Sequence, residues 1–505
     1  MFKDNNKIFI IYILLTISFI DSTNSLKCGS KNLNVTPGIV ETLPKNNSRN
    51  LEDESDNFKE LVIGFDYTSF YNNSVEESIK NQIKELLEEV SSLFKKFLKI
   101  KTKPKISDSN LKKLIKTRCK IEAELPDNIT ETINTNDITI FPYFTEFTGQ
   151  DEDSTYMNGR FCLITRDLRP IGGFIQINKD INFNLINAKE YYKHILFHQM
   201  THILLFDAGL LDALGMIKDN QIITNTVKQV ARHHFNCMEF LLDEDFGLPL
   251  EEDNEHWDSR YMLGDYMVSF DYFDKTISDM TFALFDDSGI YQTIKIYGKY
   301  FNFGHEKNCS FIQSECSSAN FNEFCSTSGE AKCSQSRMSK GYCTSITEAD
   351  NCLVSNYETQ NENYFFSTSC KYENNIGDSD ESFGYDSFCF ISSINNINNN
   401  YLPKCYKVAC DPTNRKIIVY MNNTQIATCS NGETIYNPNG ITGNLICPKY
   451  TEICSENNNY ICKDMFDCFD EKFARDYVIH DEDFSELIRF NILFVFINLF
   501  IFIFS

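Results

Sequence analysis

The chain has 505 residues, which is too long for a single hydrophobic core and indicates two or three domains. Its hydrophobic fraction of 42% is typical of a globular protein, and its formal net charge is −24. A polyanion of this size repels phosphate backbones, so the composition argues against nucleic acid as a partner.

The N-terminal segment has the features of a secretory signal. Lys3 and Lys7 are followed by an apolar run over residues 8–20 and then by small polar residues. We therefore expect residues 1–25 to be a signal peptide that is cleaved, with an uncleaved membrane anchor as the alternative. Residues 26–60 are polar, and we expect them to form a pro-segment or a linker.

Strands and helices are expected to alternate between about residues 60 and 300. Beta-branched residues predict strands at 61–65 and 138–141, and a further strand is expected at 174–177, after a pair of glycines. Apolar residues at helical spacing predict a helix over 75–98.

Another helix is expected over residues 188–206, which contain neither Gly nor Pro. It carries His198 and His202, and residues four apart share a helix face, so both imidazoles could bind one metal ion. This spacing alone is a weak signal. The full zinc-peptidase motif has a general-base Glu in second place, and this chain has Gln199 there.

The C-terminal third has a different composition. Fifteen of the 19 cysteines lie between Cys309 and Cys468. After a secretory signal, this density predicts disulfides formed in an oxidising compartment, and hence a disulfide-rich domain of loops and strands over 301–470. A linker is expected at 471–489. Residues 490–505 are almost all apolar, which predicts either a lipid-anchor signal or a transmembrane tail.

Several segments resemble, in order, the leishmanolysin family of zinc metalloendopeptidases, a branch of the metzincins. The family pattern is similar to His-Glu-Met-x-His-x-Leu-Gly-Phe, from which Gln199 and Leu205 depart. The positions that match it are His198, Met200, His202, Leu204 and Phe206. The segments similar to the family's edge strand, Ala-Arg-x-His-Phe-x-Cys motif, third-ligand motif and Met-turn are 168–178, 231–237, 256–261 and 277–291. With the spaced cysteines, the resemblance extends over about residues 60–470.

The resemblance implies an α+β fold, with a metzincin-like domain built from a twisted sheet and an active-site helix, followed by the Cys-rich domain. It implies one subdomain over 61–205 and a second over 206–300. It also implies that His198, His202 and His256 bind Zn²⁺, with a fourth position left for water.

The same resemblance assigns further residues around the metal. Met280 would lie beneath the ion. Gly173, Phe174, Ile175 and Gln176 would form the edge strand that binds substrate.

Two more side chains could act at the metal. His194 lies four residues before His198 and could compete as a ligand, although the family pattern makes it a neighbour on the same helix face. Cys28, in the pro-segment, could block the zinc as in metzincin zymogens; a free cysteine is the alternative.

Gln199 determines the activity that we expect. In active family members the glutamate accepts a proton from water, which an amide cannot do near neutral pH. General-base catalysis typically contributes about 10²–10⁴-fold, so zinc binding should survive while peptide hydrolysis is severely impaired. Leu205 replaces the glycine that ends the family helix at a sharp turn, and we expect the helix to run on to Gly209.

Three functions follow from this sequence. The first is a zinc-binding pseudopeptidase that binds protein or peptide ligands at the cell surface or on the extracellular face of a secretory-pathway membrane, to which its C-terminal tail holds it. The second is an active zinc metalloendopeptidase with a substitute carboxylate from Glu239, Asp258 or Asp265. The third is a structural or adhesive ectodomain without metal.

Overall fold

The computed structural model describes most of the chain between residues 36 and 469. The described ranges are 36–42, 58–71, 73–147, 156–184, 188–269, 275–295, 301–356, 368–373, 375, 377–396, 398–454, 465–467 and 469. The predicted signal peptide, Cys28, the linker over 471–489 and the tail over 490–505 lie outside them. Within the described ranges, no helix combines the length and apolar character needed to cross a bilayer.

A mixed five-stranded sheet forms the centre of the N-terminal half, in the order β1-β6-β7-β5-β3. β7 runs antiparallel to β6 and parallel to β5, and β5 runs parallel to β3. In chain order, the strands of this sheet are β1 (Gly38–Ile39), β3 (Ile63–Phe65), β5 (Ile138–Thr145), β6 (Met157–Ile164) and β7 (Pro170–Asn178).

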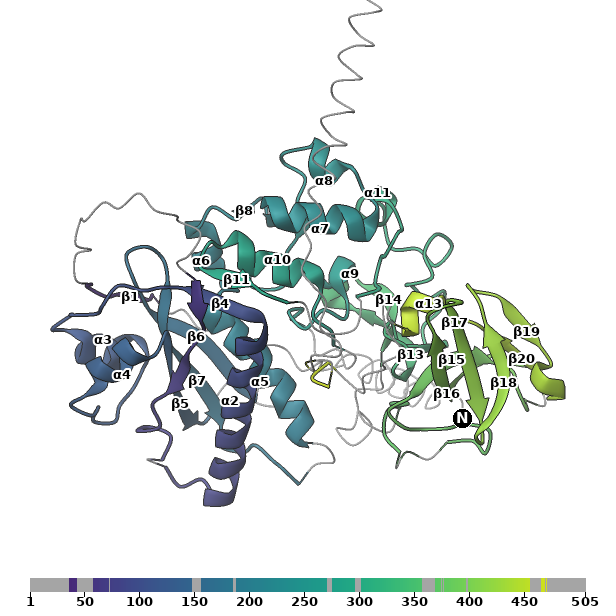
Figure 1. Cartoon of the computed structure of the whole chain (residues 1–505), viewed down its shortest axis with the longest axis horizontal. Coiled ribbons are helices and arrows are strands. Elements are labelled where there is room, and N and C mark those ends of the chain that lie inside the picture. The colour runs from purple at the N-terminus through teal and green to yellow at the C-terminus, as the bar shows by residue number, and fades with distance from the viewer. Residues whose placement is uncertain are drawn as a thin grey trace, which may run out of the picture.

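Helices cover both faces of this sheet. Figure 1 shows α3 (Leu111–Arg118) and α4 (Ile129–Thr135) on one face, and α2 (Glu77–Phe97) and α5 (Ala188–Leu204) on the other. The two faces have separate buried clusters because alternate strand residues point to opposite sides. The predicted helices over 75–98 and 188–206 correspond to α2 and α5.

The strand predicted to be the substrate edge is not an edge. β7 lies inside the sheet, where Gly173 pairs with both Phe161 and Ile140. The assignment of Gly173, Phe174, Ile175 and Gln176 to an edge strand is therefore wrong. Gly173 has a different purpose: a Cβ there would lie 2.3 Å from Ile203 Cγ2, so only glycine lets α5 pack this closely on the sheet.

Short strands and helices follow α5 and join the sheet to the C-terminal region. The helices are α6 (Ala208–Ala213), α7 (Asn225–Phe235), α8 (Glu239–Leu242), α9 (Ser259–Met262), α10 (Asp279–Asp287) and α11 (Cys309–Gln313). Two three-stranded sheets accompany them, with orders β10-β9-β8 and β11-β4-β2. Their strands are β2 (Phe58–Glu60), β4 (Leu98–Lys101), β8 (Ile217–Lys218), β9 (Gln221–Ile222), β10 (Leu248–Pro249) and β11 (Tyr291–Thr293).

The C-terminal region is built from two antiparallel sheets. The smaller contains β12 (Ala331–Cys333), β13 (Lys340–Ile346) and β14 (Cys352–Asn356). The larger has the order β18-β17-β16-β15-β20-β19, with strands β15 (Ser387–Ser392), β16 (Leu402–Asp411), β17 (Lys416–Met421), β18 (Thr424–Cys429), β19 (Thr434–Tyr436) and β20 (Asn444–Ile446). The short helices are η3 (Thr347–Ala349), η4 (Pro438–Gly440) and α13 (Tyr450–Ile453).

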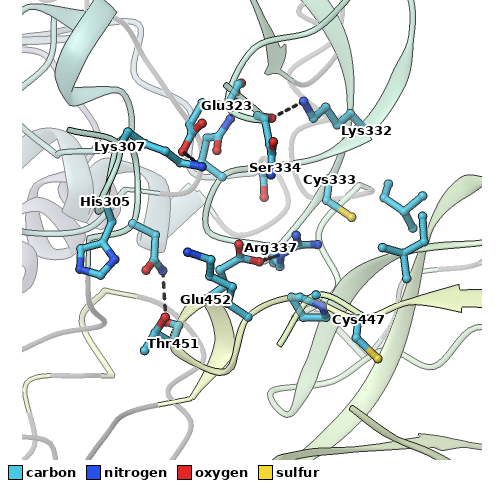
Figure 2. Close-up of a pocket in the computed structure, with 18 residues that line it drawn as sticks. His305, Lys307, Glu323, Lys332, Cys333, Ser334, Arg337, Cys447, Thr451 and Glu452 are labelled. Atoms are coloured by element: carbon cyan, nitrogen blue, oxygen red, sulfur yellow. Dashed lines mark hydrogen bonds and ion pairs between the residues drawn. The ribbon is translucent and has the colours of Figure 1, made fainter. Parts of the chain in front are cut away.

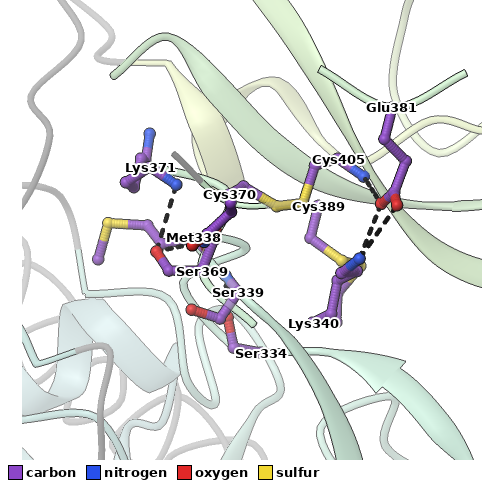
Figure 3. The surroundings of a disulfide bond; sticks show 12 residues. Ser334, Met338, Ser339, Lys340, Ser369, Cys370, Lys371, Glu381, Cys389 and Cys405 are labelled. Carbon is purple, nitrogen blue, oxygen red and sulfur yellow. Dashed lines mark hydrogen bonds and ion pairs between the residues drawn. A yellow bond between two sulfur atoms is a disulfide. The ribbon is translucent and has the colours of Figure 1, made fainter. Parts of the chain in front are cut away.

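Disulfides hold these sheets together, as their cysteine density predicts. The bonds in the described residues are Cys119–Cys162, Cys237–Cys309, Cys316–Cys352, Cys325–Cys343, Cys333–Cys389, Cys370–Cys405, Cys410–Cys454 and Cys429–Cys447. Cys389 and Cys405 face each other on β15 and β16, and their bonds leave for different segments (Figure 3). The α+β fold with a disulfide-rich, strand-rich C-terminal region is therefore confirmed.

One buried apolar cluster spans the predicted subdomain boundaries. It joins Leu196 of α5, Phe285 of α10 and Phe324 of the Cys-rich region, whereas a separate cluster lies within the larger C-terminal sheet. The boundaries at 205 and 300 stay predictions. The shared core fixes the segments after α5 relative to the helix, which matters for the site below.

Candidate metal centre

The active-site helix α5 carries two of the predicted ligands on a buried face. His198 and His202 are one turn apart and are 4% and 2% exposed. The helix packs against β6 and β7. Its Phe197 also stacks on Phe94 of α2, with ring centroids 4.4 Å apart. This packing fixes α5, and with it both imidazoles, relative to the sheet and to α2.

The third predicted ligand comes from a loop that the backbone holds on both sides. His256 is fully buried, and its carbonyl accepts a hydrogen bond of 3.0 Å from the Glu251 N–H. The next residue, Trp257, donates its backbone N–H to Met267 at 3.0 Å and its indole N–H to Thr281 at 2.8 Å. The loop therefore has a defined position although it contains no long helix or strand.

The three imidazoles converge. The ring centroids of His198 and His202 are 4.7 Å apart, and those of His256 lie 5.3 and 4.9 Å from them. One nitrogen from each ring lies within 4.8 Å of the other two, and the Nε2 atoms of His198 and His202 are 3.0 Å apart. The chain thus brings together residues that are 54 positions apart in sequence (256 − 202).

The hydrogen bonds of these rings fit a metal ion. Nδ1 of His198 lies 2.7 Å from the Tyr266 carbonyl, Nδ1 of His202 lies 2.6 Å from the Phe206 carbonyl, and Nδ1 of His256 lies 2.9 Å from Asp253 Oδ2. Each acceptor fixes the proton on Nδ1, which leaves the Nε2 lone pair of a neutral ring for coordination. Two such lone pairs 3.0 Å apart repel each other, and a cation between them removes that repulsion. Three neutral imidazoles are a donor set that zinc prefers.

Gln199, at the position predicted for the general base, is buried beside the triad. It is 2% exposed, and its side-chain oxygen accepts a hydrogen bond of 2.6 Å from the backbone N–H of Gly159 on β6. A Cβ on residue 159 would lie 2.6 Å from the Gln199 carbonyl oxygen, so glycine is required for this contact. The amide thus has a defined place, but it offers no basic group.

The end of α5 corrects one prediction. The helix stops at Leu204 and does not run on to Gly209. The N–H groups of Leu205 and Phe206 both bond to the Thr201 carbonyl, and Leu205 keeps a negative φ. Because this turn needs no left-handed residue, leucine replaces the family glycine without strain. Asp207 then caps α6, accepting from the Leu210 N–H at 3.1 Å.

Two other predicted residues lie close in sequence or space to this arrangement. Met280 is buried in the first turn of α10, and its neighbour Thr281 bonds to Trp257; its place beneath the metal stays a prediction. His194 lies on α5, and its ring packs against Phe466 with centroids 4.4 Å apart. It does not belong to the converging group of described residues.

The predicted substitute carboxylates do not join the triad among the described residues. Glu239 lies beside the Cys237–Cys309 disulfide. Burial raises the pKa of Asp258 to about 7, a value suited to a general base, but its carboxylate caps α9 through the Arg260 N–H at 2.8 Å. Burial also raises the pKa of Asp265, whose oxygens accept from neighbouring backbone and hydroxyl groups.

Sequence reasoning missed a buried charge cluster beside the ligands. Arg160 of β6 binds Asp207 with Nη1 at 2.7 Å and both oxygens of Glu255 with Nη2 at 2.6 Å. The pairs are separated by 47 and 95 residues, so no local pattern reveals them. Asp253, three residues before His256, was also missed, although an acidic residue at that spacing was visible in the sequence.

A separate cavity of about 270 Å³ lies where the central and C-terminal regions meet (Figure 2). Its lining contains none of the three histidines of the triad. Two ion pairs lie in its lining: Lys307 pairs with Glu323 at 3.4 Å and Arg337 with Glu452 at 2.5 Å. Arg337 and Glu452 are 115 residues apart in sequence, so their ion pair joins distant segments of the chain. This indicates a structural junction.

Comparison with known proteins agrees with the geometry. A sequence model of leishmanolysin matches residues 76–374 and 367–460, which is most of the chain. The chain belongs to the leishmanolysin family. The matched ranges contain the active-site helix, the third histidine and most of the C-terminal cysteines. Membership and the eight disulfides among the described residues indicate an extracellular or surface protein.

A curated relative to which the chain is similar is the ciliated left-right organizer metallopeptidase of Danio rerio. It is 23% identical over 358 residues, which cover 62% of this chain and 55% of the relative. The chain thus spans about half the length of that relative. Leishmanolysin-family proteins are metallopeptidases, and the converging triad can hold the metal that such chemistry requires.

Proposed function

We propose that the protein is an extracellular zinc-binding member of the leishmanolysin family with strongly impaired peptide hydrolysis, which acts by binding protein or peptide ligands. His198, His202 and His256 would hold the zinc. When bound, zinc supplies a Lewis acid that lowers the pKa of water and polarises a peptide carbonyl. The remaining chemistry depends on groups of the chain itself, and there this protein differs from an active peptidase.

The observation that carries the proposal is the environment of Gln199. Its oxygen is already bound to the Gly159 N–H, and an amide nitrogen has no lone pair that accepts a proton near neutral pH. No atom at this position can therefore take the proton from water or pass it to the leaving amine. Loss of a general base typically costs about 10²–10⁴-fold in rate.

Two of the carboxylates near the ligands, Glu255 and Asp253, are engaged. Glu255 precedes His256, but both of its oxygens bind Arg160 at 2.6 Å. Asp253 binds the Nδ1 of His256 at 2.9 Å, which orients that ring. For Glu255 or Asp253 to act as a substitute base, one of these contacts would have to be given up, which disfavours the second reading, an active metalloendopeptidase.

The retained ligands disfavour the third reading, a metal-free structural or adhesive ectodomain. All three histidines are buried, and all three Nδ1 partners are in place. A chain that no longer binds metal has no reason to keep three neutral imidazoles at this separation. Attachment to a membrane through residues 490–505 remains part of the proposal.

Two measurements on the full chain test the proposal. Metal analysis of the purified protein should find one zinc per chain, and a chain without metal would support the structural ectodomain. Cleavage of a peptide library should be far faster for Gln199→Glu than for the native chain. Equal and substantial turnover by both would show that the native protein is an active peptidase.

A matched control separates restored chemistry from an altered fold. The double variant Gln199→Glu, His256→Ala keeps the new carboxylate but removes a ligand. It should lose the activity gained by the single variant. Persistent cleavage by the double variant would indicate a contaminating protease.

A further inference from the structure

We propose that Arg160 is a positioning residue for the metal triad. Its guanidinium fastens two segments to β6: the loop that carries His256, and the turn after α5, which orients His202. This inference rests on the proposed metal binding. It assigns to the cluster of Arg160, Asp207 and Glu255 a role that neither the family match nor the named relative supplies.

The contacts of Arg160 are directed and buried. Nη1 lies 2.7 Å from Asp207 Oδ2, and Nη2 lies 2.6 Å from both oxygens of Glu255. The side chains of the three residues are only 8–12% exposed. Such charge-assisted bonds are shorter and stronger than neutral ones, and the planar guanidinium fixes their direction.

Each carboxylate belongs to a residue next in sequence to one that would bind the metal or that orients a ligand. Glu255 immediately precedes His256 in the chain. Asp207 immediately follows Phe206, whose carbonyl accepts from Nδ1 of His202 at 2.6 Å. A single guanidinium therefore controls the position of the third ligand and of the group that orients the second.

The need for this clamp follows from the end of α5. The helix ends at Leu204 without a left-handed residue, and the turn at 205–207 is held by hydrogen bonds to Thr201 and by Asp207. Asp207 has two tasks, since Oδ1 caps α6 while Oδ2 binds Arg160. The ion pair thus anchors the turn to the sheet two residues after Leu205, the position where the family pattern has its glycine.

The neighbouring residue on β6 extends the same logic. Gly159 donates its N–H to Gln199, in the place of the general base. Two consecutive residues of β6 therefore make these contacts: Gly159 binds α5 itself, and Arg160 binds the turn after α5 and the loop of His256. By contrast, His198 is oriented by the Tyr266 carbonyl, which belongs to a different segment of the chain, so we expect the clamp to act on the other two ligands.

The test compares Arg160→Lys with the native chain. Lysine keeps the positive charge but cannot bind both carboxylates through a planar fork. Outer-shell partners of metal ligands typically contribute about 10–100-fold to metal affinity, and we expect a loss of zinc affinity in this range, measured by competition with a chromophoric chelator. The visible absorption of the Co²⁺-loaded protein should also change, because two imidazoles lose their fixed orientation.

Arg169→Lys is the matched control. Arg169 is a buried arginine in the turn between β6 and β7 that binds Asp137 at 2.8 Å, and neither residue contacts the triad in the described structure. It should lower thermal stability while leaving the zinc affinity and the Co²⁺ spectrum unchanged. A general loss of stability would therefore not imitate the predicted effect.

Glu255→Gln provides a second variant if Arg160→Lys does not fold. It keeps the size of the side chain and one hydrogen-bond acceptor, and we expect a smaller loss of zinc affinity. Native affinity and an unchanged Co²⁺ spectrum in the folded variants would overturn the role of Arg160 while the proposed function stands. A native chain that binds no metal would instead overturn both.

Discussion

The side-chain oxygen of Gln199 accepts a 2.6 Å hydrogen bond from the backbone N–H of Gly159. This contact joins the position of the family's general base to the strand above the active-site helix. It is possible only because residue 159 has no side chain. The helix and the strand therefore approach each other closely at the position that the sequence predicts for the general base.

Replacing Gly159 by alanine should destabilise the protein by about 1–3 kcal/mol, which is typical of overpacking in a tight core. The added methyl group would lie 2.6 Å from the Gln199 carbonyl oxygen, so α5 must shift away from β6. Chemical denaturation would measure the loss. Because the shift displaces His198 and His202, zinc affinity should fall as well.

Gly209→Ala serves as the control for that substitution. Gly209 is exposed in α6, and a Cβ there would meet Asp207 Oδ1 only at an ordinary 3.4 Å. Alanine is favoured over glycine inside helices, so this variant should be unchanged or stabilised by up to about 1 kcal/mol. A similar loss in both variants would show that the close packing of α5 on β6 is not the cause.

Removal of zinc should lower the melting temperature of the full chain. A ligand that binds only the folded state stabilises it by about 2.7 kcal/mol at a free concentration one hundred times Kd. Differential scanning calorimetry with and without added zinc would measure the shift. The His256→Ala variant should show no such shift, whereas His305→Ala, outside the triad, should keep it in full.

Stability should also fall in acid because of His234. Burial lowers the pKa of His234 to about 3, while its Nε2 lies 2.7 Å from the Phe303 carbonyl. Below a pKa of about 6.5 the histidine is protonated in the unfolded chain but stays neutral in the folded chain. The contribution of His234 to the free energy of unfolding is therefore lost as the pH falls from about 6.5 towards 3. Between pH 7.5 and 5 the loss amounts to about 2 kcal/mol.

His234→Gln isolates this effect. Glutamine can still donate to the Phe303 carbonyl but does not titrate, so its unfolding free energy should depend less on pH than that of the native chain. The exposed His233, next in sequence, is the control, and His233→Gln should retain the native pH profile. Parallel profiles for native chain and His234→Gln would contradict the assignment.

Much of the fold could be predicted from local patterns. The helical spacing of apolar residues located α2 within two residues at its N-terminus, and the helix with the two histidines was recognised because Gly and Pro are absent from it. The cysteine density predicted the disulfide-rich region. These features depend on short segments, whose physical signals lie within the sequence itself.

The order of strands could not be predicted in the same way. Segment 168–178 was assigned to an edge by resemblance, but β7 receives β5 on one side and β6 on the other. Nothing in its own residues tells which strands flank it. The exit of α5 was predicted wrongly for a related reason: the Leu205 turn is stabilised by Asp207 and by the hydroxyl of Tyr291, which donates to the Leu204 carbonyl.

The site shows the same division. The three histidines were found through motifs, and the structure brings them together. The groups that orient the three histidines were not found from the sequence. Two of the three Nδ1 acceptors are backbone carbonyls, which any residue possesses. Arg160 remained hidden because its partners lie 47 and 95 residues away.

The adjacent cystines of the larger sheet have a consequence for making this protein. Cys333, Cys370, Cys389 and Cys405 form one buried group, and four thiols can pair in three ways. The native pairing links β12 to β15, and the segment before β15 to β16 (Figure 3). A cell that synthesises this chain must therefore correct mispaired thiols while β15 and β16 come into register, so a host with an oxidising compartment and a disulfide isomerase is the appropriate source of material.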